Sequence, residues 1–208
     1  MKNSNTTTRS ILWSSHRLVG VVALAVALAL VPSVAAHAQT ITPPAVPPGL
    51  EVLPPNKVFL VAHGVGTQNY ECQPAATLGR VAWTLFTPQA TLFSDRRDQL
   101  ITHFSSPNPI EGDSVRVTWQ DSADTSRVWA RATATAIVKA TAIPWVRLEA
   151  VGTLVGPNGG DTLSRTTFIQ RVNTEGGLAP ATDCDHLDDT GRKAFVPYTA
   201  DYVFYTQD

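Results

Sequence analysis

Apolar and polar residues alternate along most of the chain, in short runs that show no helical period. Val115, Val117 and Trp119 alternate with polar neighbours, which is typical of a strand with one buried face. Clusters of proline and glycine separate the runs and indicate turns. The pattern predicts ten short strands, at residues 58–62, 67–72, 81–86, 90–93, 100–104, 115–119, 128–138, 145–152, 166–172 and 202–205.

The predictions for three of these regions depend on local sequence. The glycine-rich segment 63–66 predicts a tight turn between the first two strands, and Thr87-Pro88 predicts a turn between the third and fourth. Residues 128–138 are rich in alanine, which favours a helix by intrinsic propensity. Their small and apolar residues nevertheless recur at every second position, so we predict a strand there.

Strands at hairpin-like spacing, without an amphipathic helix, predict an all-β fold. We expect an antiparallel β-sandwich or a jelly-roll-like barrel of about ten short strands, formed by a single domain over residues 56–208. Six prolines between residues 39 and 55 exclude a helix or a central strand there. We predict an extended Pro-rich N-terminal arm, which serves as a spacer or, alternatively, as a ligand for an aromatic groove.

The first 38 residues have the order of a secretory signal peptide. Basic residues come first, an apolar run follows over 18–31, and the small-residue pattern Ala36-His37-Ala38 ends it. The run is shorter than the roughly 20 residues of a membrane span, although an uncleaved anchor is the alternative. We therefore predict a signal peptide at 1–38, cleavage before Gln39, and a secreted or periplasmic protein without stable membrane insertion.

Cleavage changes the charge of the protein. The 208-residue chain has a formal net charge of −1. The leader holds three basic residues and no acidic residue, so the remaining 170 residues carry a charge of −4. A nucleic-acid-binding protein needs a surplus of Lys and Arg to neutralise phosphates, and this composition excludes that class.

The two cysteines, Cys72 and Cys184, both follow the predicted cleavage site. In an oxidising compartment they are expected to form a disulfide, with two separate thiols as the alternative. Their spacing excludes a CxxC redox or metal motif. The disulfide would close a loop of more than a hundred residues.

Motifs for catalysis or cofactor binding are absent from the sequence. The G-x-G of residues 64–66 lacks the third glycine and the following helix of a dinucleotide site, and no cofactor is predicted. None of the three histidines that follow the leader, His63, His103 and His186, is spaced to form a local ligand pair. His103 shares a strand face with Ile101, so we expect a partly buried, hydrogen-bonded residue. The alternative is a general base in a small hydrolase.

Two further features have a structural and a functional interpretation. Four carboxylates near the second cysteine are weak candidates for a Ca²⁺ site, but they fail the EF-hand pattern, and a solvated acidic loop is the expected alternative. Tryptophans on strands can stack on sugar rings, although such residues usually belong to the core. The carboxylates are Asp183, Asp185, Asp188 and Asp189, and the tryptophans are Trp83, Trp119, Trp129 and Trp145.

Several stretches together resemble the DUF3455 family, a group of secreted proteins of unknown function. The resemblance covers residues 45–206 and includes Gly66-Thr-Gln-Asn-Tyr-Glu-Cys72, Leu100-Ile-Thr-His-Phe104 and Thr167-Phe-Ile-Gln-Arg-Val-Asn-Thr174. It implies export and a Cys72–Cys184 pairing, and it supplies no catalytic residue. Polar and aromatic residues of the shared stretches are the candidate binding residues: Thr67, Gln68, Tyr70, His103, Trp145, Gln170 and Arg171.

These observations favour a non-catalytic binding or surface module, for a glycan or another component of the cell envelope. A small secreted hydrolase that uses His103 is the first alternative. A structural or stress-related protein without a small ligand is the second. The surroundings of His103 and the exposure of the tryptophans distinguish these hypotheses.

Overall fold

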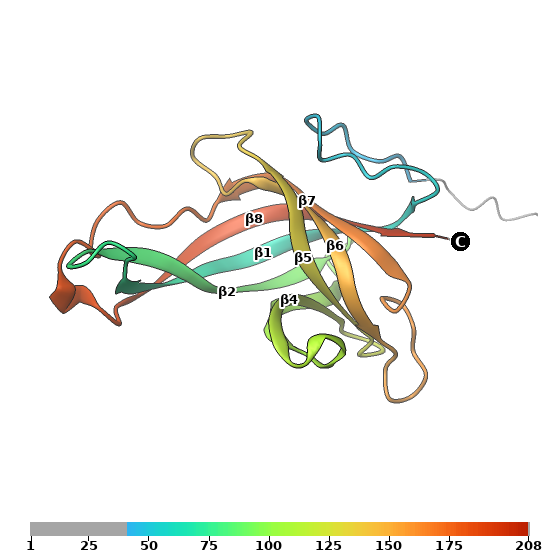
Figure 1. The fold of residues 1–208 in the computed structure, drawn as a ribbon. Helices are drawn as coiled ribbons and strands as arrows, with labels where there is room; N and C mark the ends of the chain where they lie inside the picture. Colours follow the sequence, from blue (N-terminus) through green and yellow to red (C-terminus); the bar gives the residue numbers. More distant parts are fainter. Residues whose placement is uncertain (1–40, 208) are drawn as a thin grey trace, which may run out of the picture. The chain divides into compact units, whose positions relative to one another are not determined.

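The computed structural model describes residues 41–207, and within this range eight antiparallel strands form a closed barrel (Figure 1). Each strand pairs with its neighbours in the sequence, and β8 also pairs with β1, which closes the barrel. In Figure 1, β8, β1 and β2 run side by side. The strands are β1 (Lys57–Pro74), β2 (Val81–Phe93), β3 (Gln99–Asn108), β4 (Ser114–Asp121), β5 (Arg127–Ala136), β6 (Trp145–Leu154), β7 (Thr166–Gly176) and β8 (Lys193–Thr206).

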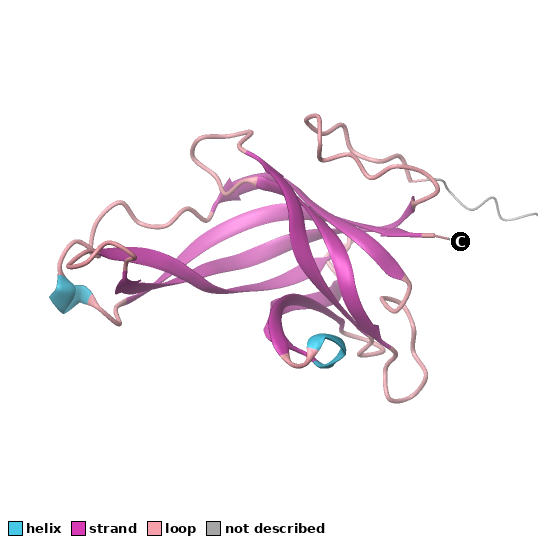
Figure 2. Cartoon of the chain, viewed as in Figure 1, coloured by secondary structure: helices cyan, strands magenta, loops and turns pink. Residues whose placement is uncertain are grey.

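The described residues contain little structure besides strands and loops. Besides the strands there are two 3-10 segments, η1 (Pro109–Glu111) and η2 (Leu187–Asp189), and Figure 2 draws the helical turns in cyan. None of the helices in residues 41–207 is long and apolar enough to cross a membrane. The predicted signal peptide at 1–38 lies outside the described residues.

The all-β antiparallel prediction is confirmed, but the predicted number of strands and their arrangement are corrected. The barrel is a closed meander of eight strands, not a sandwich or jelly roll of about ten. The difference comes from two predicted turns, at 63–66 and 87–88, that lie inside the continuous strands β1 and β2. Removing these two breaks turns the ten predicted segments into the eight strands observed.

The glycines of β1 serve close packing between strands and not a turn. A Cβ atom on Gly64 would lie 2.7 Å from the ring of Tyr202, and one on Gly66 would lie 2.1 Å from the carbonyl oxygen of Gln89. Glycine inside a strand often marks such a close approach, because any side chain would collide with the neighbouring strand. The two glycines are therefore explained by the close approach of β2 and β8 to β1.

Pro88 has a different effect on the barrel wall. The register of β2 with β3 runs from Phe93 to Ala90 and stops before Pro88, which has no N–H to donate. Beyond that point the Thr87 hydroxyl accepts a hydrogen bond from the backbone N–H of Ser105, at 3.1 Å. The backbone ladder therefore holds the β2–β3 seam at one end of the barrel only.

The barrel interior is filled at the end where this ladder is intact. Apolar side chains from several strands form one buried cluster there, together with Leu163 from the β6–β7 loop. The N–H of Leu163 donates to the Ser126 hydroxyl at 3.0 Å, which fixes the loop against the barrel. Eight strands leave just enough interior for side chains or for one small ligand. The cluster includes Ala62, Leu92, Ile101, Val128, Leu163, Ile169 and Phe204.

A second apolar cluster covers the outer face of β7 and β8. Val172 and Val203 pack there against Val46 and Val52 of the Pro-rich segment. Its described part, residues 41–55, has turns but no regular secondary structure. It is docked on the barrel, where Leu50 is almost fully buried.

Candidate functional site

The barrel interior contains a cavity of about 440 Å³. The cavity reaches solvent at the ends of β2, β4 and β5, because four of its lining residues are exposed: Leu85, Val115, Arg131 and Ala132. Every strand contributes to the lining, which places the cavity inside the barrel. One residue from each strand in order is Gln68, Pro88, His103, Trp119, Ala130, Leu148, Arg171 and Tyr202.

His103 forms part of the deep wall of this cavity. Its side chain is 2 % exposed, stacks on Trp119 with ring centroids 4.2 Å apart, and places Nδ1 2.9 Å from the carbonyl oxygen of Thr118. A carbonyl only accepts, so Nδ1 carries the proton and Nε2 is an acceptor. Burial lowers the pKa of His103 to about 3, which keeps the imidazole neutral at physiological pH.

Arg171 brings a positive charge to the cavity from β7. Its Nη2 donates to the carbonyl oxygen of Pro144 at 3.0 Å, immediately before β6. Among the described residues, no carboxylate lies within ion-pair distance of its guanidinium. Burial raises the pKa of Tyr202, and the charge of Arg171 opposes that shift only in part, so the phenol stays protonated. Arg171 is therefore a cation that the surrounding protein does not neutralise.

Three buried donors of the cavity lining have no acceptor within the protein. They are Nε2 of Gln68, Nε1 of Trp119 and Nε of Arg171. Nearly all buried donors in folded proteins are paired, because an unpaired one costs about 1–3 kcal/mol. All three belong to residues that line one cavity, and acceptor atoms of a bound molecule are what would satisfy them.

The structure divides the seven predicted binding residues between the two faces of the barrel. Gln68, His103 and Arg171 line the cavity. The Tyr70 hydroxyl donates to the carbonyl oxygen of Gly177 at 2.7 Å and so holds the β7–β8 loop. The remaining three, Thr67, Trp145 and Gln170, do not line the cavity.

Gln170 and Trp145 have structural contacts on the outer face. The Gln170 side chain donates to the carbonyl oxygen of Leu50 at 2.6 Å and accepts from the hydroxyl of Tyr205 at 2.5 Å. Trp145 packs in the same outer cluster as Val46 and Val52. These two residues hold the N-terminal arm against the barrel.

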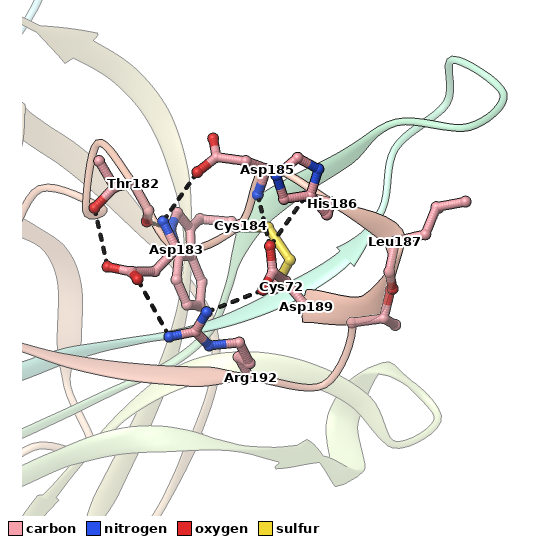
Figure 3. Close-up of a disulfide and its surroundings, with 11 residues drawn as sticks. Cys72, Thr182, Asp183, Cys184, Asp185, His186, Leu187, Asp189 and Arg192 are labelled. Carbon is pink, nitrogen blue, oxygen red and sulfur yellow. Dashed lines mark hydrogen bonds and ion pairs between the residues drawn. A yellow bond between two sulfur atoms is a disulfide. The ribbon is translucent and has the colours of Figure 1, made fainter.

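The predicted disulfide is present. Cys72 at the end of β1 is bonded to Cys184 in the β7–β8 loop, with a Cα–Cα distance of 5.5 Å and a sequence separation of 112 residues (Figure 3). Backbone hydrogen bonds flank the bond: the N–H of Cys72 donates to the carbonyl oxygen of Arg192, and the N–H of Gly191 donates to that of Cys72, each at 2.9 Å. The loop is therefore fastened to β1 both covalently and by its backbone.

The acidic loop uses its carboxylates to hold its own backbone. One oxygen of Asp189 accepts from the N–H groups of Asp185 and His186, and the other accepts from Arg192 at 2.9 Å (Figure 3). These bonds, led by that of His186, lower the pKa of Asp189 to about 2. Within residues 41–207 no cluster of three or more His, Cys, Asp or Glu side chains could hold a metal ion, so the structure gives the Ca²⁺ hypothesis no support.

Sequence reasoning missed a second histidine site, on the outer face of the barrel. His63 lies between two carboxylates, with Nδ1 2.7 Å from Asp201 and Nε2 2.8 Å from Asp95. Asn173 donates to the other oxygen of Asp201 at 2.7 Å. No local motif could have revealed this group, because its carboxylates lie 32 and 138 residues away in the sequence.

This arrangement predicts a pH dependence of stability. Hydrogen bonds to Asp95 and then to Asp201 raise the pKa of His63 above its ordinary value of 6.5. A raised pKa in the folded state means that the stabilisation is fully present below pH 6.5 and is lost as pH rises through the folded pKa. The side chain is 44 % exposed, so we expect at most about 1 kcal/mol.

Melting temperatures of the wild type and of His63→Gln, measured from pH 5.5 to 8.5, test this expectation. The wild type should be the more stable protein at the acidic end, and the difference should shrink as the pH increases. Asp95→Asn should show a smaller effect in the same direction, because Asp201 would remain. Parallel curves for the wild type and His63→Gln would contradict the assignment.

The comparisons with known proteins agree with the sequence resemblance. No curated protein and no solved structure matches the chain. The family model described as "Protein of unknown function (DUF3455)" matches residues 54–206, a range that includes all eight strands and the cavity. The resemblance predicted from the shared stretches is thereby confirmed, and the chain belongs to the DUF3455 family.

Proposed function

We propose that this protein is an exported, non-catalytic binding protein that holds one small molecule inside its barrel. The observation that carries the proposal is the cavity lined by all eight strands, with three buried donors that the protein does not satisfy. Its volume of about 440 Å³ falls in the range of roughly 300–1,000 Å³ that is typical of small-molecule sites. A mostly apolar lining with a few polar groups is also typical of such sites.

Export is supported by two independent features of the chain. The first is the signal-peptide pattern of residues 1–38. The second is the Cys72–Cys184 disulfide, because disulfides persist in oxidising compartments. We therefore place the ligand in the periplasm or the surrounding medium.

The arrangement of the tryptophans does not favour a sugar-stacking platform on the surface. Such a platform needs at least two exposed, coplanar rings. Trp119 and Trp129 are buried, and Trp145 belongs to the outer cluster beneath the arm. Trp83 donates its indole N–H to the carbonyl oxygen of Thr182 in the loop that carries the disulfide. The interior cavity is therefore a better location for a ligand than the outer sheet.

The hydrolase alternative depends on His103, and its surroundings argue against it. A general base benefits from a carboxylate that orients it and from a pKa near the working pH. His103 instead has the backbone carbonyl of Thr118 as its hydrogen-bond partner, and its lowered pKa makes it a weak base. We assign His103 a binding role, as a neutral acceptor and a stacking surface.

A substitution that fills the cavity tests the proposal. Ala132 on β5 lines the cavity and is exposed, so Ala132→Trp should occupy the opening without overpacking the core. Compounds that bind the wild type in a thermal-shift screen and in native mass spectrometry should bind this variant at least tenfold more weakly. The matched control is Ala82→Trp, which places the same side chain on an exposed β2 residue outside the lining.

Two outcomes would contradict the proposal. The first is a set of ligands whose affinity is the same for Ala132→Trp and the wild type, because their site would then lie outside the barrel. The second is the absence of any ligand in the screen, which would favour the structural alternative.

A further inference from the structure

The charged residues of the cavity lining are all basic. Three arginines line the cavity, and the described lining contains no aspartate or glutamate. Arg116 forms two hydrogen bonds with Glu111, and Arg131 forms one with Glu149 at 2.9 Å. Among the described residues no carboxylate pairs with Arg171, and its Nη2 donates to the carbonyl oxygen of Pro144. An otherwise acidic protein thus directs one unneutralised cation into its interior.

The neighbours of Arg171 add hydrogen-bond donors but no charge. Gln68 of β1 and Arg171 of β7 line the same cavity, and the charge of Arg171 acts on both Tyr198 and Tyr202. The hydroxyls of these two tyrosines are 2.8 Å apart. Burial raises the pKa of both tyrosines, so the two phenols remain neutral. The polar part of the cavity therefore has one positive charge and unused N–H groups.

The rest of the lining is apolar and extends toward solvent. Val117, Val146 and Leu148 continue the wall, and Leu85 and Val115 lie at the opening. A ligand that satisfied only the polar groups would leave this surface in contact with water. A ligand with an apolar body covers it, at a gain of roughly 25 cal/mol for each Å² removed from water.

We propose, building on the binding function above, that the ligand is an amphiphilic monocarboxylic acid whose carboxylate is bound by Arg171 and Gln68. One unneutralised cation matches one negative charge. A carboxylate is acceptor-only and can take hydrogen bonds from several donors at once, which is what the unpaired Nε of Arg171 and Nε2 of Gln68 offer. The apolar body then lies along the valines and leucines that lead to the opening.

Three probes with the same alkyl chain separate charge from apolar contact. Decanoate, decanamide and decylammonium carry a negative, a neutral and a positive head group. In isothermal titration calorimetry the wild type should bind decanoate at least tenfold more tightly than either of the others. Arg171→Gln should lose at least tenfold in affinity for decanoate and keep its affinity for decanamide, because charge-assisted hydrogen bonds are the stronger ones.

Two more variants complete the test. Arg165→Gln is the matched control, since it removes an exposed cation that does not line the cavity, and decanoate affinity should change by less than threefold. Gln68→Met removes a buried, unpaired donor at nearly constant size. It should bind decanoate more weakly while its ligand-free form is at least as stable as the wild type. This second variant keeps the test decisive if Arg171→Gln folds poorly.

The outcomes distinguish the ligand class from the binding function itself. Equal affinity for all three probes, each abolished by Ala132→Trp, would overturn the carboxylate assignment and leave the barrel as the binding site. Binding of none of the three probes would overturn the carboxylate assignment, and the ligand screen would then decide the binding function. Loss of decanoate affinity in Arg165→Gln as large as in Arg171→Gln would also overturn the assignment of the carboxylate to Arg171.

Discussion

Replacement of both Cys72 and Cys184 by serine is expected to lower the free energy of unfolding by about 4 kcal/mol. The disulfide closes a loop with a sequence separation of 112 residues, and most of the stabilisation comes from the conformations that it removes from the unfolded chain. The native fold should survive, because backbone hydrogen bonds between Cys72 and residues 191 and 192 remain. Urea denaturation of the two proteins measures the difference.

The wild type in the presence of a strong reductant is the control for this experiment. Its unfolding midpoint should agree with that of the double variant. Both proteins lack the covalent link, and this is the only change from the oxidised wild type that they have in common. A decrease of less than about 1 kcal/mol in the free energy of unfolding would contradict the expectation that the disulfide stabilises the protein by closing this loop.

The second large effect is expected for Gly66→Ala, which should cost about 3 kcal/mol. A Cβ atom at this position would lie 2.1 Å from the carbonyl oxygen of Gln89 and 2.5 Å from Cα of Ala90. Both are backbone atoms of β2 and take part in the ladder with β1, so they cannot move aside as a flexible side chain would. Thermal unfolding of the variant measures the loss of stability.

Gly79→Ala is a control that separates steric collision from backbone conformation. Gly79 has a φ of +73° and no atom within 4 Å of an added Cβ, so its replacement should cost only about 1 kcal/mol. If Gly66→Ala is no more destabilising than Gly79→Ala, the two strands do not approach as closely as the structure indicates.

The alternating pattern predicted part of every strand, including the alanine-rich strand β5, although it covered only residues 202–205 of β8. It was not enough to predict how many strands there are. Whether a glycine makes a turn or permits a close approach depends on the residue opposite it, and Gln89 and Tyr202 are brought to Gly66 and Gly64 by pairings far apart in sequence. Closure into a barrel depends on the β1–β8 pairing, which no local window contains.

The candidate site was predictable in part, through the stretches shared with the family. Gln68, His103 and Arg171 came from those stretches, and the structure places all three at the cavity. Gln170 came from the same stretch as Arg171 and lies on the opposite face. Alternation requires that separation, but it does not say which face is interior.

Strand β7 shows why the two faces could not be told apart from the sequence. Ile169 packs in the interior core, whereas Phe168 and Val172 pack in the outer cluster beneath the arm. Both faces of the strand are therefore apolar, because the arm gives the outer face a core of its own. The hydrophobic pattern alone therefore does not distinguish the interior face of β7 from its outer face.

The position of β8 has a consequence for how this chain folds. Residues 193–206 pair with β1 on one side and with β7 on the other, so the strand at the C-terminal end of the barrel completes both seams. Until it is in place, β1 and β7 each present an open edge, and such edges are templates for aggregation. Contacts between the first and last strands also make folding slow, since they require closure of the longest loop. The barrel can therefore close only when this strand is available to pair, and earlier intermediates need protection from one another.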